Sequence, residues 1–205
     1  EGEEIVNISC KKAKYKMRGL STTDYPESEE FVQDWNFTLP GINLVNALTK
    51  VSYARSEDES RKALFGILLS IRSGMLTVAA TDGRRLALVE NPFNEEMKSE
   101  TEGDIIIPSK VVGELVKSFA TKDIIEVKMN TTSAKFISNT TTITTKLVDG
   151  TYPNYRSVIP ANFSHKAIIP RVQFSEALRQ ASCFINELNG GVSFNFSGNE
   201  MEIKS

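Results

Sequence analysis

The feature that most constrains this chain is an alternating run of apolar residues, 67–89, that two turn signals divide. Ser73-Gly74 interrupts the run first and Asp82-Gly83 interrupts it again, and each pair suits a tight turn because glycine adopts positive φ without steric cost. Strict alternation predicts strands, since successive side chains of a strand point to opposite faces. We therefore expect antiparallel strands whose second turn presents the side chains of Arg84 and Arg85 at a sheet edge, where a ligand binds.

Two amphipathic helices interrupt the predicted strands. Each follows a proline, Pro40 or Pro108, and proline suits the start of a helix. Their apolar stripes, at helical spacing, are Leu44, Leu48 and Val51 in the first and Val111, Leu115 and Phe119 in the second. Strands are predicted over residues 3–22, 35–39, 63–90, 105–107, 124–130, 133–138 and 141–148, with residues 91–103 as a polar loop.

The later part of the chain repeats the earlier part. Pro40 and Leu48 recur as Pro170 and Leu178, each displaced by 130 residues. Residues 20–26 also resemble residues 147–153, with a shared Tyr-Pro pair. A displacement of this size matches a domain and not a solenoid unit. We expect the end of one copy in residues 1–34, a complete copy in 35–160 and the start of a third in 161–205.

Composition excludes several classes of protein. The 205 residues carry a net charge of −2, which excludes a uniformly basic nucleic-acid binder but leaves a local basic face open. His165, the one histidine, has no nucleophile motif beside it, and no cofactor loop or metal-ligand spacing occurs. We therefore predict no catalytic residue, no cofactor and no metal.

Cysteine usage and the start of the chain bear on its location. Cys10 and Cys183 are far apart, and we expect both to be buried, reduced thiols, as in a cytoplasmic protein. No apolar run is long enough to cross a membrane. The first residues are acidic and unlike a signal peptide, and without an initiator methionine the chain is expected to begin inside a longer protein.

Cations recur on the predicted helices, on or near the side away from each apolar stripe. Two of them, Lys110 and Lys117, are seven residues apart and therefore lie on one helical face. On their own, these residues favour an ordinary solvated helix surface over a ligand surface. They are Lys50 and Arg55 on the first helix, Lys110 and Lys117 on the second, and Arg171 and Arg179 in the third copy.

Four segments together carry a family resemblance. In order, they are residues 37–40 (FTLP), 80–87 (ATDGRRLA), 105–108 (IIIP) and 146–156 (KLVDGTYPNYR). In this order and spacing they resemble the β subunit of bacterial DNA polymerase III, the sliding clamp family. The resemblance implies an α+β DNA-clamp fold, with repeated domains whose helices line a channel and whose antiparallel sheets lie outside. It covers about half of a family subunit.

The resemblance also implies a function. Family members are non-catalytic processivity factors that form a head-to-tail homodimeric ring around double-stranded DNA. The six helix cations would then face the channel and contact phosphates, which gives salt-sensitive attraction without sequence preference. The implied partners are the DNA polymerase III catalytic subunit, other polymerases and the clamp loader, which supplies ATP hydrolysis.

In the family, these partners insert a short peptide with a glutamine and hydrophobic residues into a pocket between the middle and third domains. The matching wall here is Leu64, Thr81, Gly83, Arg84, Arg85, Leu86, Pro153, Tyr155 and Val158. Gly83 would let a peptide backbone approach, and Arg85 would bond its carbonyl or carboxylate oxygens. Two positions depart from the family pattern, because Arg84 stands where many members have histidine and Ser157 where some have arginine.

Two alternatives remain open from the sequence. One is a divergent clamp-like protein that keeps the fold without DNA or partner binding. The other is a secreted β-rich binding module, which several Asn-x-Ser/Thr sequons and threonine-rich strands would suit.

Overall fold

The computed structural model describes residues 5–19, 23, 31–94, 98–99, 102–120, 122–185, 191–198 and 200–204. The chain divides into two compact units, a first unit of residues Glu1–Tyr155 and a second of Arg156–Ser205. The N-terminal hairpin consists of β1 (Ile5–Cys10) and β2 (Ala13–Arg18). The shared Tyr-Pro pair at residues 25–26 lies outside the described residues, and the three-domain division stays a prediction.

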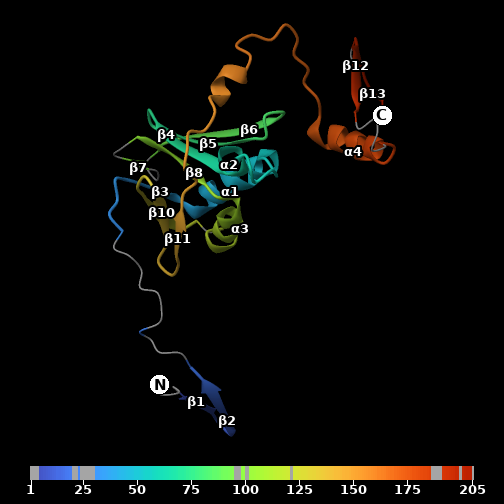
Figure 1. Ribbon diagram of the computed structural model, residues 1–205. Helices are drawn as coiled ribbons and strands as arrows, with labels where there is room; N and C mark the ends of the chain where they lie inside the picture. Colours follow the sequence, from blue (N-terminus) through green and yellow to red (C-terminus); the bar gives the residue numbers. More distant parts are fainter. Residues whose placement is uncertain are drawn as a thin grey trace. The chain divides into compact units, whose positions relative to one another are not determined.

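Two antiparallel sheets and two main helices build the body of the first unit (Figure 1). The larger sheet has the order β11-β10-β9-β3-β7 and the smaller sheet the order β6-β5-β4-β8. In the larger sheet the bounds are β3 Trp35–Pro40, β7 Lys98–Ser99, β9 Ile124–Met129, β10 Ser133–Ile137 and β11 Thr142–Lys146. In the smaller sheet they are β4 Ile67–Arg72, β5 Met75–Thr81, β6 Leu86–Pro92 and β8 Gly103–Ile107.

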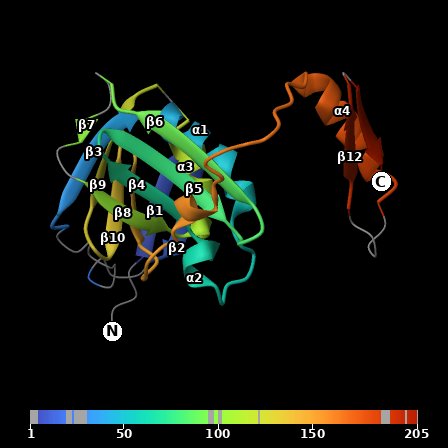
Figure 2. The same ribbon diagram turned by 90° about the horizontal axis from the view of Figure 1, so that it is seen from above.

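The helices α1 (Gly41–Val51) and α3 (Ser109–Ser118) contact one another and lie side by side in both views (Figure 1 and Figure 2). The predicted stripe of α1 is fully buried. In α3, Leu115 and Phe119 are buried as predicted, but Val112 is more deeply buried than Val111. Both valines lie within one turn of Leu115, so the helix turns the neighbouring residue inward. One core cluster contains side chains from both sheets and both helices.

The two tight turns of the smaller sheet are confirmed. Ser73 and Gly74 have φ of 51° and 71° between β4 and β5, and Gly83 has φ of 88° between β5 and β6. The strand predicted from residue 63 is wrong at its start, because Lys62–Phe65 form the short helix α2 and β4 begins at Ile67. The amides of Leu64 and Phe65 donate to the Arg61 carbonyl, which forms this turn of helix. The predicted loop over 91–103 is also wrong in part, since it contains strand residues of β6, β7 and β8.

The second unit contains α4 (Arg171–Ser182) and a hairpin of β12 (Ser193–Ser197) and β13 (Glu200–Lys204). The helix follows Pro170, as the repeat predicts. The expectation of buried thiols is wrong, because Cys10 and Cys183 are both exposed. Cys10 ends a strand of a two-stranded sheet, and Cys183 follows the last turn of α4, so neither reaches a packed core. Within the described residues, no helix is both long and apolar enough to cross a membrane.

Candidate docking site at the β5–β6 turn

The turn between β5 and β6 is held by its own side chains. Asp82 Oδ1 accepts hydrogen bonds from the amides of Arg84 and Arg85, at 2.8 and 3.0 Å. These amides, first that of Arg84 and then that of Arg85, hold the pKa of Asp82 below its usual value. Thr81 Oγ1 donates to the Arg85 carbonyl at 2.7 Å and accepts from the Gly83 amide at 3.0 Å. Asp82 is therefore a structural residue of the turn.

Arg85 is oriented on two sides. Its Nε donates to Asp82 Oδ2 at 3.1 Å, and its guanidinium carbon lies 5.8 Å from the centroid of the Tyr53 ring. Tyr53 belongs to a short 3-10 helix, η2 (Ser52–Ala54), that contacts β5 and β6. The Arg85 side chain is still 54% exposed. A guanidinium held in this way keeps part of its donor set toward solvent, where it can bond an incoming carbonyl or carboxylate.

Arg61 reaches the same turn from the residue before α2. Its Nη1 donates to the Asp82 carbonyl at 2.7 Å. A Cβ added to Gly83 would lie 3.1 Å from Arg61 Nη2. The open side of Gly83, expected to admit a peptide backbone, is thus occupied by a guanidinium. Sequence reasoning missed Arg61 and Tyr53, because no local spacing links either of them to a turn more than 20 residues away.

A second set of apolar side chains in the first unit lies outside the main core cluster. Ala80 belongs to the core cluster, so Thr81 points to the opposite face, and Leu86 shares that face as the cross-strand partner of Thr81. Several buried apolar side chains lie outside the core cluster: Leu64, Leu68, Ala79 and Ile106. Thr81 and Leu86 are thus neighbours on one face of the smaller sheet, and their role in docking stays a prediction.

Residues 147–155, which we call the strap, connect this face to the end of the first unit. The Val148 amide donates to the Ile106 carbonyl at 2.9 Å, and the Thr81 amide donates to the Tyr152 hydroxyl at 3.1 Å. Pro153 follows Tyr152 directly and is therefore placed near the end of β5. Burial raises the pKa of Tyr152 to about 12. Tyr155, half-buried, ends the first unit.

The predicted channel cations have different surroundings. Lys50, Lys110 and Lys117 are exposed on α1 and α3, and Lys117 Nζ lies 3.0 Å from Glu114 on the same helix face. Placing Arg55 on the first helix is wrong, because it follows η2 in an extended conformation and its guanidinium lies 5.3 Å from the centroid of the Phe65 ring.

Several predicted site residues lie in the second unit. Arg171 and Arg179 are exposed on α4, and Val158 is also exposed. No observation tests the roles of Val158, Arg171 and Arg179, which stay predictions.

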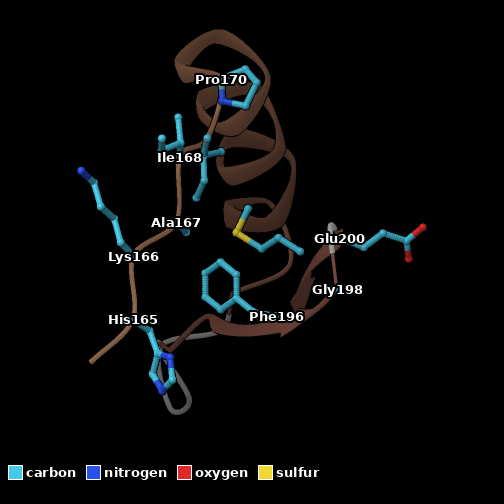
Figure 3. A pocket seen from close by; sticks show the side chains of 10 residues that line it. His165, Lys166, Ala167, Ile168, Pro170, Phe196, Gly198 and Glu200 are labelled. Carbon is cyan, nitrogen blue, oxygen red and sulfur yellow. The ribbon is translucent and has the colours of Figure 1, made fainter. Parts of the chain in front are cut away.

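The second unit also has a groove of about 1030 Å³ between residues 165–170 and the β12–β13 hairpin (Figure 3). His165 and Glu200 lie on different sides of the groove, and the ring of Phe196 lies between them. The His165 imidazole is exposed, and Figure 3 shows it away from the Glu200 carboxylate. The described residues contain no cluster of three or more His, Cys, Asp or Glu side chains that could hold a metal ion.

The sequence and the fold resemble those of known proteins. The family described as "DNA polymerase III beta subunit, central domain" matches residues 38–154. This chain belongs to that family. The beta sliding clamp of Chlamydia muridarum is 30% identical over 201 residues, which cover 98% of this chain and 54% of that protein. The beta sliding clamp of Pseudomonas aeruginosa is 26% identical over 99% of this chain and 55% of its own length.

Solved structures agree on the fold. A crystal structure of the DNA polymerase sliding clamp from Pseudomonas aeruginosa with ligand has a TM-score of 0.89 and 25% identity, and covers 99% of this chain and 55% of that chain. A putative DNA polymerase III beta subunit from Eubacterium rectale has a TM-score of 0.89 at 18% identity, again with 99% and 55% coverage. The predicted α+β clamp fold is confirmed. The chain spans about half the length of the relatives it matches.

Proposed function

We propose that this chain is part of a sliding clamp, a ring that encircles duplex DNA and keeps a replicative polymerase on its template without catalysing a reaction. Membership of the β subunit family, through a match to residues 38–154, is the observation that carries this proposal. The ring would be a head-to-tail homodimer in the cytoplasm. Its contacts would go to phosphates and not to base edges, because sliding requires weak interactions that do not depend on sequence.

The β5–β6 turn would provide the middle-domain half of a partner-docking site. Leu64 and Leu86 would contact the hydrophobic anchors of a peptide, and such anchors carry most of the affinity in small interfaces. Arg85, already oriented by Asp82 and Tyr53, would bond the peptide's polar groups with little further loss of conformational freedom. The proposed partners are the polymerase III catalytic subunit, other polymerases and the clamp loader.

The exposed lysines of α1 and α3 would face DNA. Lys50, Lys110 and Lys117 each carry one positive charge on a long, exposed side chain. The carboxylate of Glu114 partly neutralises the charge of Lys117. Such a surface attracts phosphates weakly and loses that attraction as salt is added. Weak attraction of this kind would let the ring move along DNA.

Peptide binding tests the docking part of the proposal. A fluorescent Gln-Leu-x-Leu-Phe-type peptide should bind the full-length protein with micromolar affinity, about −8 kcal/mol. An Arg85→Ala, Leu86→Ala double mutant should lose this binding. Lys146→Ala, which removes an exposed cation from β11, is the matched control and should bind as the wild type does. A folded wild-type protein that fails to bind would show that docking has diverged.

Retention on DNA tests the encircling part. After loading by a clamp loader, the protein should stay on circular DNA and leave when the circle is linearised. A triple Lys50→Ala, Lys110→Ala, Lys117→Ala variant should load poorly at physiological salt and better at low salt. If the protein dissociated equally fast from circular and linear DNA while it still bound the peptide, the divergent clamp-like protein would be supported instead.

A further inference from the structure

We infer that Tyr152 is a positioning residue for the proposed docking site, because its hydroxyl fixes the end of β5 and thereby the turn that follows. The inference rests on the proposed function. Tyr152 itself is not inferred to contact the partner peptide. The residue acts through Thr81, whose backbone amide donates to the Tyr152 hydroxyl.

The backbone explains why β5 needs this hydroxyl. The ladder between β4 and β5 runs from the Arg72–Met75 pair to the Leu68–Ala79 pair, so Thr81 lies beyond its end. A half-buried backbone amide in this position requires an acceptor. Tyr152 supplies one at 3.1 Å from a point 71 residues later in the chain. The hydroxyl therefore takes the place of a further strand partner.

Thr81 transmits this constraint to the turn. Its hydroxyl donates to the Arg85 carbonyl and accepts from the Gly83 amide, so one side chain spans the turn. Its amide is held by Tyr152 at the same time. Displacement of Thr81 would loosen both bonds across the turn and would shift Leu86, its cross-strand partner. Pro153, directly after Tyr152, would lose its placement beside the strand as well.

The ring of Tyr152 alone does not explain these contacts. Phenylalanine would fill nearly the same volume, but it would leave the Thr81 amide without its acceptor. The hydroxyl is neutral at physiological pH, as that of an ordinary tyrosine is, and burial raises its pKa further, to about 12. If Tyr152 only filled space, Tyr152→Phe would leave the turn unchanged. If its hydroxyl holds the Thr81 amide, the same substitution would loosen the turn, so the inference can be tested.

The test compares Tyr152→Phe with Ser70→Ala in the full-length protein. Ser70 Oγ donates to Asp104 Oδ1 at 2.6 Å, so Ser70→Ala removes one hydrogen bond from the same sheet, far along the strands from the turn. Two quantities are measured: affinity for the Gln-Leu-x-Leu-Phe-type peptide and hydrogen exchange of the amides of residues 81–85. Tyr152→Phe should weaken peptide binding by about threefold to tenfold and speed exchange at Thr81 by about tenfold. Ser70→Ala should leave both within about twofold.

The outcomes separate the inference from the function beneath it. Faster exchange and weaker binding in Tyr152→Phe alone would support the inference. Wild-type binding that Tyr152→Phe leaves unchanged would overturn the inference and leave the docking function standing. Equal weakening by Ser70→Ala would also overturn it, because general loosening of the sheet would then explain the effect. A wild-type protein that does not bind the peptide would overturn the docking function and the inference together.

Discussion

Replacing Gly83 with alanine should destabilise the first unit for two separable reasons. The residue has φ of 88°, where a Cβ costs about 1–2 kcal/mol. The new methyl group would also lie 3.1 Å from Arg61 Nη2, so the guanidinium would have to move from its 2.7 Å hydrogen bond to the Asp82 carbonyl. Weakening that bond would cost up to about 1.5 kcal/mol more. Together these effects predict a loss of about 1–3.5 kcal/mol in the free energy of unfolding.

A second glycine in the same sheet provides the control. Gly74 has φ of 71° in the β4–β5 turn, and a Cβ added there meets nothing within 4 Å. Gly74→Ala therefore measures the conformational cost alone, about 1–2 kcal/mol. Combining Gly83→Ala with Arg61→Ala should bring the effect of the Gly83 substitution down to the same level, which a double-mutant cycle would show.

The assay is urea unfolding followed by the fluorescence of Trp35. This is the one tryptophan in the chain, and it packs against the core cluster of the first unit, so its emission reports on that unit. The variants are compared by transition midpoint at constant slope, because a changed slope would signal a different unfolded state. Equal losses for Gly83→Ala and Gly74→Ala would refute the contact between Arg61 and the turn.

Other predictions follow from packing, charge and pKa. Gly66→Ala should destabilise the first unit by about 1–3 kcal/mol in urea unfolding, because its methyl would lie 2.5 Å from Ile106 Cγ2; an unchanged midpoint would contradict this packing. In binding to linear DNA titrated with salt, Glu114→Gln should steepen the log–log dependence of affinity by about one unit, and Lys110→Gln should lower it similarly. The free energy of unfolding should fall between pH 10 and about 12. The reason is that folded Tyr152, with a pKa of about 12, keeps a proton that an unfolded tyrosine loses from about pH 10. Tyr152→Phe should reduce this pH dependence.

The strands and turns of the first unit were predictable because their causes are local. Alternation sets the faces of β4, β5 and β6, and glycine at positive φ marks both turns. The helix α2 was not predictable, since it has only four residues and a short apolar segment suits a helix or a strand equally well. The error for Arg55 has the same origin, because the helical pattern does not show that η2 ends before this residue.

That Thr81 and Leu86 share one face could be predicted, but the contacts within the turn could not. Thr81 and Leu86 are cross-strand partners and so could be grouped from sequence. Arg61 and Asp82 are 21 residues apart, and Thr81 and Tyr152 are 71 apart. Periodicity describes neighbours within one element, and these hydrogen bonds join residues from different elements. The guanidinium beside Gly83 could not be predicted for the same reason, because Arg61 comes from another element.

The strap is also expected to affect the order in which the first unit folds. Closing a long loop costs entropy that only contacts formed earlier offset, so the Tyr152–Thr81 bond is expected to form late in folding. During synthesis, β5 and β6 leave the ribosome well before residue 152 does. A nascent chain would thus carry the arginines of the turn without its last anchor. The turn of a partly synthesised chain would therefore be less well ordered than that of the finished chain.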